Sequence, residues 1–137
     1  MLFDWEGPYG KISIRAFSNL GVNVAAQKNF EVDQNTTFTF EVQYLDEDQV
    51  PIQLHFHTAK LQVRDTQGGK KLAFTLVEND GIVINPTLGK LQISISADRT
   101  NKMFYPKSAY DLVLIDPSVN KTRLLEGYMT LSRSVTI

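Results

Sequence analysis

The segment from Thr36 to Tyr44, TTFTFEVQY, decides the fold class of this chain. Within it Phe38, Phe40 and Val42 alternate with polar residues. Successive side chains of a β-strand point to opposite faces, so this segment has one apolar and one polar face. The segment from Leu91 to Ser96, LQISIS, alternates in the same way. This two-residue periodicity predicts strands that each cover one side of a core.

Similar segments recur along the chain and are separated by turn residues, which predicts an all-β domain. Further strands are expected at residues 11–17, 22–26, 29–33, 59–64, 72–76, 82–84, 109–116 and 122–131. Residues 97–105 lack alternation and predict a single helical turn, capped by Ser96 or Asp98. Turns spaced every 8–12 residues or so, without a long helical pattern, are typical of a β-sandwich or barrel.

Length and composition exclude several classes of protein. A chain of 137 residues is the size of one domain with a substantial core. The absence of cysteine excludes disulfide scaffolds, cysteine zinc sites and thiol nucleophiles. No apolar run approaches the roughly 20 residues of a membrane helix, and the first ten residues do not resemble a secretory signal. The net charge of −1 argues against a general nucleic-acid binder. We therefore expect no membrane and no nucleic-acid partner.

The charge is unevenly divided along the chain. Residues 1–58 contain three bases and eight acids, a balance of −5, whereas residues 59–137 contain 11 bases and seven acids, a balance of +4. One interpretation is a chance distribution over a folded surface. The other is head-to-tail or ring assembly, in which an acidic patch of one copy faces a basic patch of the next.

The residue types that usually carry chemistry do not converge on a site. His55 and His57 would share one side of a strand, but no third metal ligand is indicated, so we expect an exposed strand edge and no metal site. The acidic run 46–48 lacks the ligand spacing of a calcium loop and predicts a solvated turn. Residues 68–71, GGKK, do not complete a phosphate-binding loop. We therefore expect no catalytic residues, no cofactor and no enzymatic activity.

The N-terminal region differs from the rest of the chain. Residues 1–28 are interpreted as an arm or an extra hairpin, and residues 29–137 as a compact domain. Residues 1–10 have no clear period and contain three large aromatic residues, Phe3, Trp5 and Tyr9. These side chains either plug one end of the domain or dock on a neighbouring subunit, where aromatic residues commonly anchor interfaces. The second alternative makes them the predicted interface residues.

Four fragments of the chain resemble one protein family in their order and spacing. They are EVQYLDEDQVPIQL (41–54), TAKLQVRDTQGGKKLAFTL (58–76), GKLQISISADRT (89–100) and YDLVLIDPSVNKTRLLEGYMTLSRSVT (110–136). The family comprises small immunoglobulin-like structural domains of tailed-bacteriophage virions, often associated with tail, baseplate or fibre. It usually has Leu-Thr-Gly-Tyr where this chain has Leu54–His57, so Phe56 replaces a glycine. We expect a different local backbone there.

The resemblance implies an all-β, immunoglobulin-like antiparallel β-sandwich with the N-terminal arm or hairpin added to it. It also implies a non-enzymatic structural component of a virion, made in the host bacterial cytoplasm and assembled in the tail or baseplate. Its partners would be other virion structural proteins and further copies of itself. A head decoration or neck adaptor protein is one alternative, and a module that binds a host-surface glycan or protein is another.

Two residues of the last fragment have a physical interpretation of their own. Tyr110 begins an apolar strand and is expected at the edge of the core, with its hydroxyl group hydrogen-bonded. Gly127 lies in the middle of a strand, where glycine usually marks a bulge or a close approach of another backbone segment.

Overall fold

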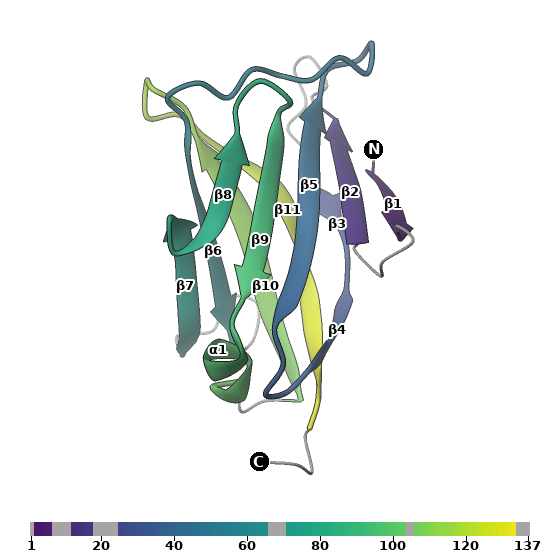
Figure 1. Ribbon diagram of the computed structural model, residues 1–137, viewed down its shortest axis with the longest axis vertical. Helices are drawn as coiled ribbons and strands as arrows, with labels where there is room; N and C mark the ends of the chain where they lie inside the picture. The colour runs from purple at the N-terminus through teal and green to yellow at the C-terminus, as the bar shows by residue number, and fades with distance from the viewer. Residues whose placement is uncertain (1, 7–11, 18–24, 66–70, 104–105, 134–137) are drawn as a thin grey trace.

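The computed structural model describes residues 2–6, 12–17, 25–65, 71–103 and 106–133, and only the backbone in β1 and in most of β2. These residues form eleven strands and one short helix (Figure 1), which confirms the all-β prediction. The elements are β1 (Leu2–Glu6), β2 (Ile12–Phe17), β3 (Ala26–Gln27), β4 (Phe30–Asp33), β5 (Phe38–Leu45), β6 (Thr58–Arg64), β7 (Leu72–Glu78), β8 (Gly81–Asn85), β9 (Lys90–Ile95), α1 (Ala97–Asn101), β10 (Lys107–Ile115) and β11 (Lys121–Ser132).

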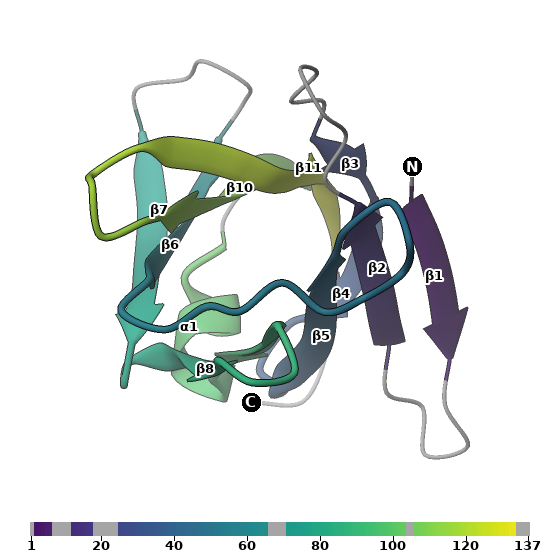
Figure 2. The same cartoon turned by 90° about the horizontal axis from the view of Figure 1, so that it is seen from above.

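The strands belong to one continuous sheet that curls around the core (Figure 2). The hydrogen-bonded order is β1-β2-β5-β9-β8-β7-β6-β10-β11-β3, and β4 also pairs with β11. In Figure 1, β5, β9 and β8 lie in front of β10 and β11. Most pairs are antiparallel, but β2–β5, β7–β8, β11–β3 and β11–β4 are parallel. The sheet is therefore mixed, not purely antiparallel as expected, and the immunoglobulin-like arrangement stays a prediction.

The core is filled by the alternate residues that the sequence pattern marks as inward. Phe40 and Val42 of β5 have no exposed surface, and neither do Leu91, Ile93 and Ile95 of β9. A fully buried Leu, Ile or Phe side chain contributes roughly 1.5–3 kcal/mol relative to an exposed one. The two-residue rhythm of the sequence thus corresponds directly to the interior of the curled sheet.

Aromatic rings fill the part of the core next to β4. The ring centroid of Phe30 lies 5.2 Å from that of Phe38, 4.6 Å from that of Phe40 and 5.6 Å from that of Tyr110. Rings at these separations contribute beyond the apolar area that they bury. The cluster fixes β4, at one end of the sheet, against β5 and β10.

The helix α1 covers the end of the molecule opposite the loop between β8 and β9 (Figure 1). Its N-cap is Ser96, whose hydroxyl accepts a hydrogen bond from the backbone N–H of Arg99 at 3.3 Å, as one of the two capping predictions had it. Thr100 is fully buried and donates to the carbonyl of Thr36 at 2.9 Å. Among the described residues, no helix has the length and apolar character needed to cross a bilayer.

Residues 1–28 are interpreted from the sequence as an arm or an extra hairpin, and within them residues 2–6, which showed no clear period in the sequence, form the strand β1 and not an irregular arm. This strand pairs antiparallel with β2, and β2 pairs parallel with β5. The two-residue alternation of Phe3 and Trp5 with Asp4 and Glu6 was present in the sequence, but the glycines and proline that follow obscured it. Ile14 of β2 is buried in the common core. The division between residues 28 and 29 stays a prediction.

Lys28, just before β4, is held on β10 and β11 by the two residues singled out in the sequence. The predicted hydrogen bond of the Tyr110 hydroxyl and the predicted close backbone approach at Gly127 are both confirmed. The hydroxyl of Tyr110 donates to the carbonyl oxygen of Lys28 at 2.6 Å, and the N–H of Lys28 donates to the carbonyl of Glu126 at 3.0 Å. A Cβ atom at Gly127 would collide with that same Lys28 carbonyl, so only glycine fits. Burial raises the pKa of Tyr110 above its usual range, so its hydroxyl keeps its proton for this bond.

Candidate assembly surfaces

Three connections gather at one end of the molecule, at the top of Figure 1. They are residues 46–57 between β5 and β6, residues 86–89 between β8 and β9, and residues 116–120 between β10 and β11, together called the loop end. The N–H of Leu54 donates to the carbonyl of Pro86 at 3.0 Å, and the side-chain amide of Gln53 donates to the carbonyl of Thr87 at 3.0 Å. These bonds tie the first two connections together.

Two of the loops at this end are built in the same way, each around an aspartate. The carboxylate of Asp46 accepts bonds from the N–H groups of Asp48 and Val50, at 2.9 and 3.0 Å. That of Asp116 accepts from Ser118 and Asn120, both at 2.9 Å. Such carboxylate-to-backbone bonds define local turns. The acidic run 46–48 is therefore a structured loop, and the carboxylate of its first residue serves the loop itself.

Hydrogen bonds from the loop also set the charge of Asp116. The backbone N–H of Asn120 is the main cause that lowers the pKa of Asp116, with smaller contributions from the Asn120 side chain, Ser118 and the neighbouring His57, while desolvation acts in the opposite direction. The carboxylate therefore stays ionised at neutral pH. The pairing of Ile115 with Thr58 places the end of the 46–57 connection beside the start of the 116–120 loop.

The tips of these two neighbouring loops combine backbone strain with exposure. Phe56 has φ 61° and is 90% exposed, and Val119 has φ 67° and is 71% exposed. The left-handed region favours glycine, and a bulky or β-branched residue found there is an outlier. Phe56 thus keeps a backbone conformation that glycine adopts readily. The expectation of a local backbone different from that of the family stays a prediction.

Exposed apolar side chains concentrate at the loop end. Among the described residues the large apolar side chains that are exposed are Val50, Phe56, Leu72, Val77, Val83, Leu88 and Val119. Four of these belong to the loop end, and the other three lie on β7 and β8. Sequence reasoning missed this surface. The available signals were a valine at the turn position of DPSVN, where glycine or asparagine is usual, and a phenylalanine in place of the family's glycine.

The two histidines lie in a turn of the 46–57 connection, so the predicted strand edge at this position is wrong. The ring Nδ1 of His57 lies 3.0 Å from the carbonyl oxygen of His55. Proline at position 51 and the left-handed Phe56 both interrupt the alternation on which the strand prediction depended. In the described part of the chain, no three His, Asp or Glu side chains lie close enough to hold a metal ion.

The predicted interface residues Phe3 and Trp5 belong to β1, whose backbone pairs them with Arg15 and Ser13 of β2. Their side chains, like all of Tyr9, lie outside the described residues. β1 is the terminal strand of the sheet, and within the described ranges it pairs with β2 alone. A terminal strand presents backbone N–H and C=O groups to which another strand can add. The sheet edge at β1 is therefore a second candidate surface.

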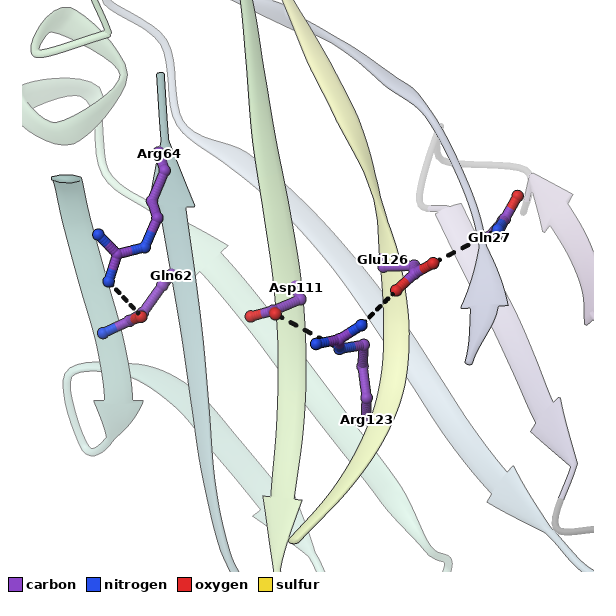
Figure 3. A network of polar contacts seen from close by, with 6 residues as sticks. All are labelled: Gln27, Gln62, Arg64, Asp111, Arg123 and Glu126. Carbon is purple, nitrogen blue, oxygen red and sulfur yellow. Dashed lines mark hydrogen bonds and ion pairs between the residues drawn. The ribbon is translucent and has the colours of Figure 1, made fainter. Parts of the chain in front are cut away.

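The outer face of β6, β10, β11 and β3 is polar and internally paired (Figure 3). Arg123 contacts Asp111 at 3.5 Å and Glu126 at 2.9 Å, and Gln27 donates to Glu126 at 3.3 Å. On β6, the strand next to β10, the guanidinium of Arg64 donates to the side-chain oxygen of Gln62 at 3.0 Å. Exposed pairs of this kind add little to stability, and a partner would have to desolvate them. This face is less suited to docking than the loop end.

The opposite end of the molecule carries exposed bases around α1. We call it the helix end, comprising residues 97–103, 106–107 and 133. The guanidinium of Arg99 contacts the carboxylate of Asp80 at 2.8 Å, and this bond is the main cause that lowers the pKa of Asp80. Lys102 is exposed at the C-cap of α1. The ammonium of Lys107 lies 4.2 Å from the ring centroid of Tyr128.

Comparison with known proteins gives the fold and little beyond it. No family model matches the sequence, and no curated protein matches it. Among solved structures, the chain is similar to the N-terminal domain of phage TP901-1 ORF48, with a TM-score of 0.53 and 6% identity, over 89% of this chain and 98% of that chain. Extracellular domains 3–5 of Drosophila OTK give a TM-score of 0.36 and 16% identity, over 75% of this chain and 32% of that one, which is too low to indicate a shared fold.

Proposed function

We propose that this chain is a non-enzymatic structural component of a bacteriophage virion, located in the tail or baseplate. The observation that carries the proposal is the shared fold with a phage protein domain, over nearly the whole of both chains. The sequence fragments between residues 30 and 136 support it independently, because they resemble structural domains of tailed-phage virions.

The role of the chain in the particle would be to join neighbours through its surfaces. The terminal strand β1, which within the described ranges pairs with β2 alone, would offer its sheet edge to other virion proteins or to further copies. The aromatic residues Phe3, Trp5 and Tyr9 would anchor that contact. Repetition in a symmetric particle makes several weak contacts sufficient, because each further contact forms within an assembly that already exists.

The use of the polar groups supports a non-enzymatic role. The carboxylates of Asp46 and Asp116 each accept two backbone hydrogen bonds within their own loops. The described part of the chain has no buried polar side-chain atom that lacks a partner. Catalytic acids and bases usually retain an unsatisfied position that faces a substrate. The carboxylates of Asp46 and Asp116 have structural partners instead.

The proposal is tested by locating the chain in purified particles. We expect mass spectrometry of density-purified virions to detect it, and antibody-gold labelling to place it on the tail tip. Labelling at the head or neck would favour the decoration or adaptor alternative, and absence from the particles would refute the proposal.

The contribution of the N-terminal segment is tested by deleting residues 1–10. We expect particles to incorporate the shortened chain poorly, while its circular dichroism keeps the β-type signal, because β1 pairs at the edge of the sheet. Loss of the β signal would show instead that this segment belongs to the folded core.

The exposed aromatic ring of Phe56 is the observation that favours the second candidate, a module that binds a host-surface glycan. Aromatic rings can stack on sugar rings through their apolar faces. A glycan array probed with the purified chain tests this candidate. An empty array would eliminate it and would leave the structural role unaffected.

A further inference from the structure

We propose that the loop end of one copy docks on the helix end of a second copy, so that copies associate end to end. The inference rests on the proposed structural role and deepens it, because it names a contact surface and its occupant. Three observations carry it: the strained exposed tips, the charges at the two ends, and the positions of the ends on the molecule.

The first observation is the rigid presentation of two apolar tips. Phe56 and Val119 occupy left-handed backbone positions on adjacent loops, and their side chains are largely exposed. The loops are held by hydrogen bonds to Asp116 and to Pro86, so the tips are fixed in place. Strain of this kind persists where a function requires it, and a pre-ordered contact loses little entropy on binding.

The second observation is that the two ends carry complementary charge. The loop end carries four acids, Asp46, Glu47, Asp48 and Asp116, and its residues 46–57, 86–89 and 116–120 contain no Lys or Arg. Bases gather at the helix end, namely Arg99, Lys102, Lys107 and Arg133, together with two acids, Asp98 and the Asp80 that is bound to Arg99. An ammonium or guanidinium group also binds the face of an aromatic ring. An end that presents a phenylalanine ring and carries four acids without Lys or Arg is therefore suited to a basic surface.

The third observation is that the two ends lie at opposite extremes of the long axis (Figure 1). A contact between unlike ends is heterologous, so it closes into a ring or extends as a stack. The structure gives a spatial basis to the uneven charge of the sequence. The acidic run 46–48 belongs to the first 58 residues, and the helix end belongs to the basic remainder.

Sedimentation velocity of the purified full-length chain tests the inference. We expect reversible association that strengthens with concentration and weakens between about 20 mM and 500 mM salt, because salt screens exposed charges. Phe56→Gly should weaken association by about tenfold or more, as for an interface anchor. Val83→Ser is the matched control, since Val83 is 62% exposed on the face of β8, and it should change association less than about twofold.

Charge reversal identifies which surfaces meet. Asp48→Lys alone and Lys102→Glu alone should each weaken association, because every junction between identical copies then joins like charges. An equimolar mixture should associate again as alternating copies, because one junction then has the reversed pair and the next has the unchanged pair. Lys60→Glu, on the face of β6, is the control that should leave association unchanged. Asp48 is chosen because only its backbone N–H binds the Asp46 carboxylate, so the loop keeps its hydrogen bonds.

Three outcomes would overturn the inference: a wild-type chain that stays monomeric at the highest concentration and lowest salt, association that Phe56→Gly does not weaken, or reversed variants that do not recover on mixing. These results would leave the proposed function open, since that depends on the presence of the chain in virions. Conversely, end-to-end association of a chain that is absent from virions would contradict only the virion role.

Discussion

Replacement of Val119 by glycine should stabilise the protein, although it removes an apolar side chain. Val119 has φ 67°, and the left-handed conformation costs a residue with a Cβ atom about 1–2 kcal/mol. The side chain is 71% exposed, so little buried apolar surface is lost. Glycine also makes the unfolded chain more flexible, which costs about 0.4–1 kcal/mol. The difference predicts an increase of about 0.5–1 kcal/mol in the free energy of unfolding.

Thermal and urea unfolding measure this difference. For a domain of this size the increase corresponds to a rise in Tm of roughly 2–4 °C. Asn79→Gly is the matched control, because Asn79 has nearly the same φ of 64° but asparagine tolerates that conformation. We therefore expect no stabilisation in the control. Phe56→Gly should behave like Val119→Gly, since Phe56 is 90% exposed at φ 61°. If Val119→Gly raised the free energy of unfolding no more than the control Asn79→Gly does, the strain argument would be refuted.

Three further predictions concern the core and the loop charges. Gly127→Ala should lower the free energy of unfolding by about 2–3 kcal/mol in urea titrations, because the added Cβ displaces the Lys28 carbonyl; no change in stability would show that this segment yields freely. Tyr110→Phe should lower it by about 1–3 kcal/mol through loss of the hydroxyl bond to the same carbonyl, and an unchanged urea midpoint would contradict the importance of that bond. The folded state lowers the pKa of Asp116 below its ordinary value of 3.8, so its contribution to stability is present above that value and is lost as the pH falls through the folded pKa. In Asp116→Asn that part of the acid dependence should disappear from Tm measured against pH, and an identical profile would refute it.

The sequence predicts the strands well because their pattern and their burial have the same cause. Each inward position of β5 and β9 must be apolar to fill the core, so the alternation is directly visible. The N-cap at Ser96 and the close approach at Gly127 were also predictable, since each depends on one residue type with one local role. The parallel pairing of β2 with β5 could not be predicted. Its paired residues are about 28 positions apart, and the alternation within a strand does not tell which other strand it pairs with.

The candidate site was largely missed for a related physical reason. Phe56 and Val119 are single residues in irregular loops, and their significance depends on φ angles that no periodicity encodes. The adjacency of the 46–57 and 116–120 loops follows from the pairing of β6 with β10, which is known only once the sheet is built. Assembly between unlike surfaces was one of two interpretations of the uneven charge, beside a chance distribution, and it did not indicate where on the molecule such surfaces lie.

The choice of residues at left-handed positions connects stability with assembly. At Asn35, Asn79 and Gly89 the chain uses residue types that tolerate a positive φ, so the fold meets this backbone requirement without strain where it can. At Gln49, Phe56 and Val119 it does not; all three lie at the loop end, and Phe56 and Val119 expose apolar surface there. Chance placement of strain would not favour one end of the molecule. Selection for an exposed side chain that contacts a neighbouring copy would favour one end, because glycine at these positions would remove that contact together with the strain. The stabilised glycine variants should therefore be the ones that lose association, which is the exchange of stability for function seen at other strained sites.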